Sequence, residues 1–419
     1  MPPRSPSYSP LPDPAAGASF GRRTTDQTES QAASLERPEV APLACMRYSP
    51  RPCVNQELVD ALKPLREWRL IEYGPNSPEA ISYSTALSAL IACPYKLRSG
   101  DEARKQLHKV GLFLPSACPM RIIDYSHPQV GHKIALKIDE FLETDHVKDA
   151  DDLLHNARFQ SLKSLMTVHG VGHHKAKELY ERGFTSAEEM RQSGKWQKEF
   201  MYHDDIQLPI PRKDVESITA FVQLQLDRIE RGSHIVICGG YRRGKLQSND
   251  VDLLITFPHQ DGKEKGILRR LCHRLECKGL IPPHGILSFS EPATLRSTRE
   301  NKKASSFDSL DKALIVFKHP SSSSTSSSSS TTRPRDIYRR VDLIVARWPS
   351  FGAAVVGWSG STQFERDLRK HAERMGLKFD SGGLRVRGTH EVIPTVMEQD
   401  VFRALKLKYI PPEFRNADP

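Results

Sequence analysis

Three aspartates occupy positions that are typical of a metal site. Asp250 and Asp252 stand at the head of the strand-like run 251–257, and Asp342 opens a second such run, 341–345. Because side chains alternate along a strand, Asp250 and Asp252 share one face while the intervening valine points into the core. Neighbouring carboxylates repel each other unless water or a divalent cation separates them, and Mg²⁺ prefers oxygen ligands of this kind. Three carboxylates on adjacent strands therefore suit a two-metal site that activates an attacking hydroxyl and stabilises a leaving pyrophosphate.

A glycine-rich turn precedes the aspartate pair. Gly239 and Gly240 directly follow the apolar run 235–238, and Arg243 and Lys245 come shortly afterwards. Glycines leave backbone N–H groups open to an anion because no side chain lies in the way. Taken alone, this segment is more typical of a tight turn with solvated cations. Its place just before two carboxylates indicates phosphate binding beside a metal.

Two further segments are typical of phosphate contacts at the start of a helix. In the first, Gly170 and Gly172 precede a helical run that contains Lys175. This helix-hairpin-helix pattern would present backbone amides to a DNA phosphate without reading the base sequence. The second segment has Gly131 and Lys133 but carries glutamine at the first glycine position, which weakens the expected phosphate turn.

The elements that must position these residues divide the chain into a helical half and a mixed half. Helical periodicity is found at 83–91, 134–142, 187–196 and 214–230. Strand-like runs are found at 235–238, 251–257, 313–317 and 341–345. The expected class is α+β, with a mixed sheet that carries the carboxylates.

Two segments are poor in the apolar residues that a core needs. Residues 1–45 are rich in Pro, Ser, Ala and charge, so we expect a disordered tail. Residues 321–332 are almost pure Ser and Thr, which predicts a flexible loop between the strands at 313–317 and 341–345.

The composition of the 419 residues favours a soluble, thiol-containing protein with an anionic partner. With a mean hydropathy of −0.51, no apolar stretch approaches the ~20 residues that a membrane helix needs. Lys and Arg outnumber Asp and Glu by 61 to 51, which favours a polyanion without requiring one. Seven cysteines without a CxxC pair indicate free thiols in a reducing compartment. A zinc site at Cys272, His273 and Cys277 is disfavoured, because these residues fall in a helical run with core-like leucines.

The string GGYRRGKLQSNDVDLLITFP at 239–258 resembles the DNA polymerases of family X, in the nucleotidyltransferase superfamily. The resemblance implies that Asp250 and Asp252 ligate two ions, Mg²⁺ or Mn²⁺. It also implies that Asp342 binds the catalytic ion and orients or deprotonates the primer 3′-OH. The residues that would contact the nucleotide are Gly239, Gly240, Arg243 and Lys245.

A segment beginning at Gly357 resembles the sugar and template contacts of the same family, in its mu and terminal transferase branch. The resemblance places Gly357, Trp358 and Gly360 at the nucleotide. It places Arg369, together with Arg340, at the DNA. Because glycine replaces an aromatic residue that other branches carry beside the sugar, we expect weak discrimination against ribonucleotides.

The run 134–142 resembles the family's lyase domain, with Lys137 at the position that forms a Schiff base. A lysine amine attacks a ring-opened sugar aldehyde when its pKa is lowered, and Lys133 is a neighbouring cation that would lower it. A solvated or phosphate-binding lysine is the alternative interpretation. Residues 107–125 form an insert relative to related chains and could displace this hairpin. Asn249 replaces a histidine of the transferase branch, which argues against efficient untemplated addition.

The resemblance implies five parts and a set of partners. The parts are the tail 1–45, a lyase-like domain 46–148, a helix-hairpin-helix subdomain 149–211, a palm 212–350 and a C-terminal nucleotide and template subdomain 351–419. A monovalent cation is expected at the helix-hairpin-helix, held by the carbonyls of Met166, Val168 and Val171. The chain carries no BRCT-like segment.

The implied function is short-gap filling in base excision repair and non-homologous end joining, nearest in type to fungal polymerase IV. We expect a nuclear monomer without membrane contact that uses dNTPs, or also rNTPs, on gapped or broken double-stranded DNA, with an end-joining ligase or end-binding factors as partners. A template-independent terminal nucleotidyltransferase and a non-catalytic DNA-end-binding scaffold are the alternatives. Dependence of the product sequence on the template would distinguish a polymerase from the terminal transferase. The intact aspartates together with Arg243 argue against the scaffold. A pure lyase would need Lys137 but not the aspartates.

Overall fold

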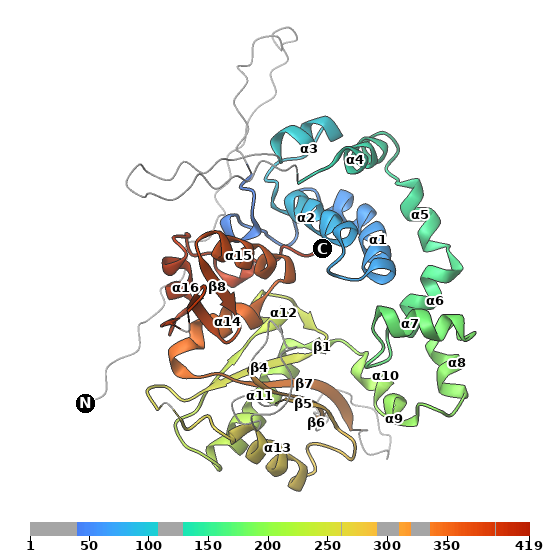
Figure 1. Ribbon diagram of the computed structural model, residues 1–419. Coiled ribbons are helices and arrows are strands. Elements are labelled where there is room, and N and C mark those ends of the chain that lie inside the picture. Colours follow the sequence, from blue (N-terminus) through green and yellow to red (C-terminus); the bar gives the residue numbers. More distant parts are fainter. Residues whose placement is uncertain (1–39, 108–128, 261, 291–309, 320–335, 390) are drawn as a thin grey trace, which may run out of the picture. The chain divides into compact units, whose positions relative to one another are not determined.

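The described part of the chain comprises residues 40–107, 129–260, 262–290, 310–319, 336–389 and 391–419 of a computed structural model (Figure 1). These residues all belong to the unit Glu39–Pro419. The Ser-rich loop 321–332 and the predicted insert, apart from Leu107, lie outside them.

The first helices pack around a core of their own. Their bounds are α1 Gln56–Tyr73, α2 Pro78–Ala92, α3 Gly100–Gln106, α4 His132–Thr144 and α5 Lys148–Leu154. Serine caps fix two of the starts. Ser77 Oγ accepts a hydrogen bond of 3.1 Å from the Ala80 amide, and Ser99 Oγ accepts one of 3.0 Å from the Glu102 amide. The fully buried side chains of this core include Leu62, Leu87, Leu90 and Ile138.

The described part of the chain begins before the predicted tail boundary at residue 45. The 3₁₀ turn η1 spans Ala44–Met46, and the preceding Leu43 is buried in the core of the C-terminal region. The Ala44 amide donates a hydrogen bond of 2.8 Å to Asp367 Oδ2. This segment has no periodicity of its own, and contacts with residues far along the chain stabilise it.

A second group of helices carries the predicted helix-hairpin-helix. Its bounds are α6 Ala157–Leu165, α7 His173–Glu181, α8 Ala187–Gln192, α9 Gln197–Phe200 and α10 His203–Ile206. Phe159, Leu162 and Leu165 are fully buried at its centre. The helix predicted at 187–196 ends already at Gln192, and Gly194 with a φ of 69° stops the helical path.

A five-stranded mixed sheet forms the centre of the second half. Its order is β2-β4-β7-β6-β5, with β2 His234–Ile237, β4 Val251–Thr256, β7 Ile337–Val345, β6 Asp311–His319 and β5 Ile286–Ser290. Strands β4 and β7 run parallel, and the other neighbouring pairs are antiparallel. The predicted strands and the α+β class are confirmed. Asp342 lies inside β7 rather than at its start, because β7 begins at Ile337.

Helices cover both faces of this sheet (Figure 1). On one face, α11 Arg212–Asp227 and α13 Ile267–Cys277 share a core with Leu253 and Ile255 of β4. On the other, α14 Phe351–Ser359 packs over Leu254 and Ile344. Because side chains alternate along a strand, Asp252 lies on the α14 side. A two-stranded sheet of β1 Ile210–Pro211 and β3 Gln247–Ser248 holds the chain just before β4.

The last region is joined to the sheet by a buried ion-pair network. Its elements are η2 Trp348–Ser350, α15 Thr362–Arg374, β8 Leu377–Asp380, β9 Gly383–Val386, β10 Val392–Ile393, α16 Glu398–Ala404 and η3 Pro412–Phe414. Fully buried Arg415 donates from Nη1 to Glu398 Oε1 at 2.7 Å, and Arg242 donates to Glu398 Oε2 at 2.5 Å. Burial alone would raise the pKa of Glu398, but Arg415 and Arg242 outweigh it and lower that pKa.

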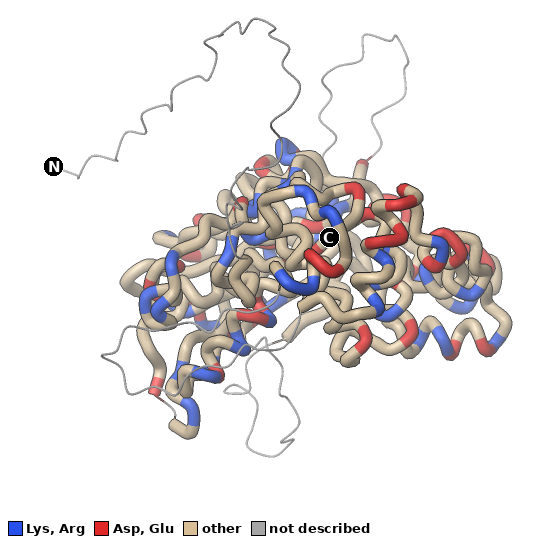
Figure 2. Tube along the Cα trace, turned by 90° about the horizontal axis from the view of Figure 1, so that it is seen from above, with Lys and Arg blue, Asp and Glu red and all other residues tan. Residues whose placement is uncertain are grey.

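Basic and acidic residues are spread over the described part of the protein rather than gathered in one region. Figure 2 shows basic and acidic residues interspersed along the tube, without one sign filling a single region. Among the described residues, no helix combines the length and the apolar character that crossing a membrane would require.

Candidate active site

The three aspartates meet on the α14 face of the sheet. The parallel pairing of β4 with β7 sets Asp252 directly beside Asp342, and Asp250 lies two residues before Asp252. One ligand atom from each of the three lies within 4.8 Å of the others. The intervening Val251 is buried in the opposite core, as the strand alternation predicts.

Burial makes this cluster electrostatically strained. It raises the pKa of Asp252 to about 7, with a further rise from Asp342, while Arg243 acts in the other direction. Burial likewise raises the pKa of Asp342 to about 6, against the lowering effect of Arg340 and then of Lys312. Asp342 Oδ1 is buried and accepts no hydrogen bond. Carboxylate oxygens in such a setting suit a hard divalent cation.

Arg340 is the nearest cation to the aspartates. Its Nη2 forms an ion pair with Asp250, and its Nε lies 3.8 Å from Asp342 Oδ1. The sequence places Arg340 at the DNA, whereas here its guanidinium neutralises two of the predicted metal ligands. Arg340 also lines a second cavity, so it stands between the two sites.

The predicted glycine-rich turn begins as a single helical turn, α12 Gly239–Arg242. Gly239 has a φ of 59°, and a Cβ there would lie 1.9 Å from Asp252 Oδ2. A Cβ on Gly240 would lie 2.9 Å from Lys245 Cδ. Gly239 is therefore required by its positive φ and its close approach to a predicted metal ligand, whereas the contact at Gly240 involves the flexible side chain of a predicted phosphate contact.

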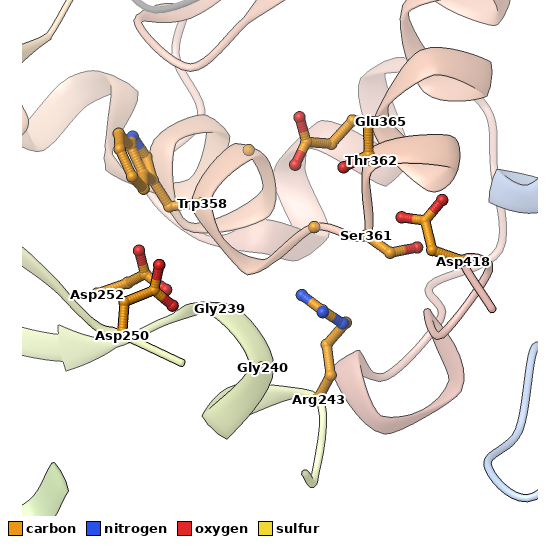
Figure 3. Close-up of a pocket in the computed structure, with 12 residues that line it drawn as sticks. Gly239, Gly240, Arg243, Asp250, Asp252, Trp358, Ser361, Thr362, Glu365 and Asp418 are labelled. Carbon is orange, nitrogen blue, oxygen red and sulfur yellow. The ribbon is translucent and has the colours of Figure 1, made fainter. Parts of the chain in front are cut away.

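A cavity of about 360 Å³ opens beside the aspartates (Figure 3). That size suits a small-molecule ligand. Its lining residues are Gly239, Gly240, Arg243, Asp250, Asp252, Gly357, Trp358, Gly360, Ser361, Thr362, Glu365 and Asp418. Eight of the residues predicted from the sequence therefore come together here, from α12, β4 and α14 and the residues next to these elements.

Arg243 fixes the geometry of this pocket. It donates from Nη1 to the carbonyl of Ser359 at the end of α14. A Cβ on Gly360 would lie 2.9 Å from the same nitrogen, so glycine leaves room for the guanidinium. Burial lowers the pKa of Arg243, and Asp418 and then Asp252 counteract this effect.

The structure adds lining residues that the sequence reasoning did not select. Ser361 and Thr362 stand at the start of α15, where a Ser-Thr pair after glycine is a recognisable helix start. Glu365 and Asp418 carry no local signal that would have revealed them. The predicted residues outside this lining include Asp342, Lys245, which packs under Gly240, and Arg369, which donates to the Glu365 carbonyl within α15.

A second cavity, of about 510 Å³, lies at the helix-hairpin-helix. It is lined by residues 166–172 together with Ile206, Gln207, Asn249 and Arg340. Gly170 has a φ of 79°, and a Cβ on Gly172 would meet nothing within 4 Å. The turn is thus open to a ligand, and Lys175 is exposed in the first turn of α7.

The environment of Lys137 differs from the expectation. Its Nζ lies 2.8 Å from Glu140 Oε2 and 2.9 Å from Asp149 Oδ2. Burial lowers the pKa of Lys137, but the hydrogen bonds to Glu140 and then Asp149 outweigh it, so the pKa is raised rather than lowered. Lys133 is exposed, one turn away on α4.

The hairpin before Lys137 is held from inside the protein. Gln129 is buried and its Oε1 accepts a hydrogen bond of 2.7 Å from Arg47 Nη1. Gly131 is the N-cap of α4, and a Cβ there would meet nothing within 4 Å. The glutamine at the first glycine position thus has a packing role.

Two family models match the two stretches of the chain that contribute most of the pocket. The model for the DNA polymerase beta palm matches residues 209–347, and that for the DNA polymerase beta thumb matches residues 354–416. DNA-directed DNA/RNA polymerase mu from Homo sapiens is 31% identical over 298 residues, covering 69% of this chain and 59% of its own length. The chain thus spans less than two thirds of that relative.

DNA nucleotidylexotransferases are similar over more of the chain. The protein from Homo sapiens is 26% identical over 388 residues, which is 90% of this chain and 71% of the relative. That from Xenopus laevis is 27% identical over 392 residues, 90% of this chain and 72% of the relative. Matches that run from the aspartate-bearing sheet through the helices of the pocket, together with these relatives, support a DNA polymerase of family X.

Proposed function

We propose that this chain is a DNA-directed DNA polymerase that fills short gaps in double-stranded DNA during repair. The observation that carries the proposal is the side-by-side placement of Asp252 and Asp342 on parallel strands, next to a pocket that Asp252 and Arg243 line. Enzymes of family X use divalent metal ions, and Asp342 Oδ1, which is buried and accepts no hydrogen bond, is a suitable ligand atom.

We propose that Asp250 and Asp252 would each help to hold two ions, Mg²⁺ or Mn²⁺. Asp342 would hold only the catalytic ion. When bound, the ions would neutralise developing charge and favour the ionised 3′-OH. Burial raises the pKa of Asp342 while Arg340 opposes this effect, and a bound cation would favour the ionised carboxylate, which can accept a hydrogen bond from the primer 3′-OH. Arg340 would exchange its ion pair with Asp250 for the DNA backbone in the adjoining cavity.

The pocket supports a nucleotide with its phosphates at α12. Backbone amides at Gly239 and Gly240 and the Arg243 guanidinium would hold the phosphates. Trp358 and Gly357 line the same cavity, and the lack of a side chain on Gly357 leaves room beside a sugar. We therefore propose that rNTPs are accepted as well as dNTPs.

DNA would be gripped by the turn at Gly170 and Gly172, with Lys175 at the phosphates. Met166, Val168 and Val171 line the same cavity, and we propose that their carbonyls would hold a monovalent cation there that strengthens the contact. We also propose that the protein is a nuclear monomer that acts in base excision repair and end joining. Its partners there would be a ligase or end-binding factors.

Primer extension on a duplex with a one-nucleotide gap tests the assignment. Asp342→Asn should abolish extension with Mg²⁺ or Mn²⁺ while gapped-DNA binding persists. Asp336→Asn is a matched control, because Asp336 lies just before the same strand and forms an exposed ion pair with Lys318. Absence of extension by the unchanged protein, with DNA binding intact, would instead favour an end-binding scaffold.

Template-independent addition is the second candidate, because relatives of this chain are named nucleotidylexotransferases. We expect templated synthesis to dominate. Extension on two gapped duplexes that differ only in the template base distinguishes the two. Products that follow the template support the polymerase, and products of the same sequence on both duplexes support the transferase.

Lyase activity finds less support around Lys137. A protonated amine held by Glu140 and Asp149 is a poor nucleophile toward a sugar aldehyde. We expect little borohydride trapping on DNA with a 5′-deoxyribose phosphate, and no change in gap filling in Lys137→Ala. Strong trapping that disappears in this variant would restore the lyase assignment.

A further inference from the structure

A carboxylate that the proposed mechanism does not use lies in the nucleotide pocket. Asp418 lines the cavity together with Arg243, Ser361 and Thr362. In Figure 3 the Arg243 guanidinium lies between the Asp250–Asp252 pair and the Asp418 carboxylate. Under the proposed function this cavity must receive a triphosphate, so a carboxylate here has the same sign of charge as the substrate.

Asp418 sits where three positive groups converge. The backbone N–H of Gln363, in the first turn of the 13-residue helix α15, donates a hydrogen bond to Asp418 Oδ2 at 3.4 Å. Arg66 Nη2, from α1, lies 3.6 Å from Asp418 Oδ1. Burial lowers the pKa of Arg243, and the charge of Asp418 is the largest of those that oppose this effect. An anion at a helix N-terminus beside an arginine occupies the kind of site that phosphate groups use.

The carboxylate is held loosely enough to leave. The distances from Asp418 to the Gln363 backbone amide and to Arg66 are long compared with the ~2.7–2.9 Å of strong charge-assisted hydrogen bonds. About a quarter of the Asp418 side chain, 24%, is exposed, so water reaches it. Arg66 keeps a separate hydrogen bond of 3.0 Å from Nε to Ser84 Oγ and so remains anchored if Asp418 moves.

We propose that Asp418 is an intramolecular anion that occupies the phosphate-binding part of the pocket until a nucleoside triphosphate displaces it. The inference rests on the proposed function. A triphosphate offers several charges to Arg243 and to the start of α15, and so outcompetes one carboxylate. A monophosphate has little to gain from displacing it. Asp418 thus favours ligands with a full triphosphate and couples their entry to release of the Arg66 contact on α1.

Equilibrium titration with a deoxynucleoside triphosphate that carries an α,β-imido bridge, in Mg²⁺, tests this inference. Asp418→Asn should bind this probe roughly three- to tenfold more tightly than the unchanged protein, since an ion-pair competitor of modest strength is lost. Its affinity for the deoxynucleoside monophosphate should stay the same. Glu373→Gln is the control, because it removes an equal charge from the far end of α15, where Glu373 pairs with Arg387.

Each outcome separates the inference from the function on which it rests. Equal or weaker triphosphate binding by Asp418→Asn would overturn the inference, because the carboxylate would then only position its neighbours. Equal tightening in Glu373→Gln would also overturn it, since net charge would explain the result. Triphosphate binding too weak to measure in the unchanged protein would overturn the proposed function together with the inference.

Discussion

Replacing Asp252 with asparagine should stabilise the metal-free protein while abolishing nucleotide transfer. Burial, and then the charge of Asp342, raises the pKa of Asp252 to about 7 from the ordinary 3.8. The native state therefore retains a proton between about pH 4 and pH 7 that the unfolded chain has released. For a carboxylate with a raised pKa, stability falls as the pH rises through this range.

The size of the effect follows from that difference in pKa. About three pKa units correspond to roughly 4 kcal/mol once the group is ionised in both states. Because the pocket admits water that screens part of this cost, we expect Asp252→Asn to gain about 2 kcal/mol above pH 7. The gain should shrink below pH 7 and disappear near pH 4, where the carboxyl group is neutral in both states.

Urea unfolding in EDTA at pH 8 and pH 4.5 measures this gain. Asp101→Asn is the control, because its exposed carboxylate pairs with Lys105 and has a lowered pKa, so its removal should not stabilise. Added Mg²⁺ should stabilise the unchanged protein by mass action but not Asp252→Asn. An asparagine variant that is less stable at pH 8 would refute the reasoning, because Asp252 would then be held by partners rather than strained by burial.

Three further changes test the pocket and its support. Gly239→Ala should reduce extension on the gapped duplex at least ~100-fold, because the new Cβ would collide with the Asp252 carboxylate. Gly194→Ala, the control, should keep its activity, because Gly194 has a similar positive φ but open space around it. Equal losses of activity in the two variants would contradict this. Glu398→Gln should lower the free energy of unfolding in urea by about 3 kcal/mol, since it leaves a fully buried arginine without its carboxylate; a loss below ~1 kcal/mol would show that the network is dispensable. Gly357→Phe should raise the preference for dNTPs over rNTPs at least ~10-fold in single-nucleotide insertion; an unchanged ratio with dNTP insertion intact would place the sugar elsewhere.

The chemistry of the sheet could be predicted from local patterns. Strand alternation alone puts Asp250 and Asp252 on one face, and the glycines before them indicate a close approach. The structure adds the reason for Gly239, whose Cβ would meet Asp252. It also adds the parallel register that sets Asp342 beside Asp252, which no short-range pattern contains.

Long-range contacts decided the rest. Lys137 looks like a nucleophile by position, yet hydrogen bonds to Glu140 on its own helix and then to Asp149 on the next helix raise its pKa. Arg340 pairs with Asp250, and Asp418 reaches the nucleotide pocket from the segment that follows η3. Periodicity and residue type report which face a side chain takes within its own element. The protonation state of a buried group and the lining of a cavity depend on neighbours from other elements, and only tertiary packing brings those together.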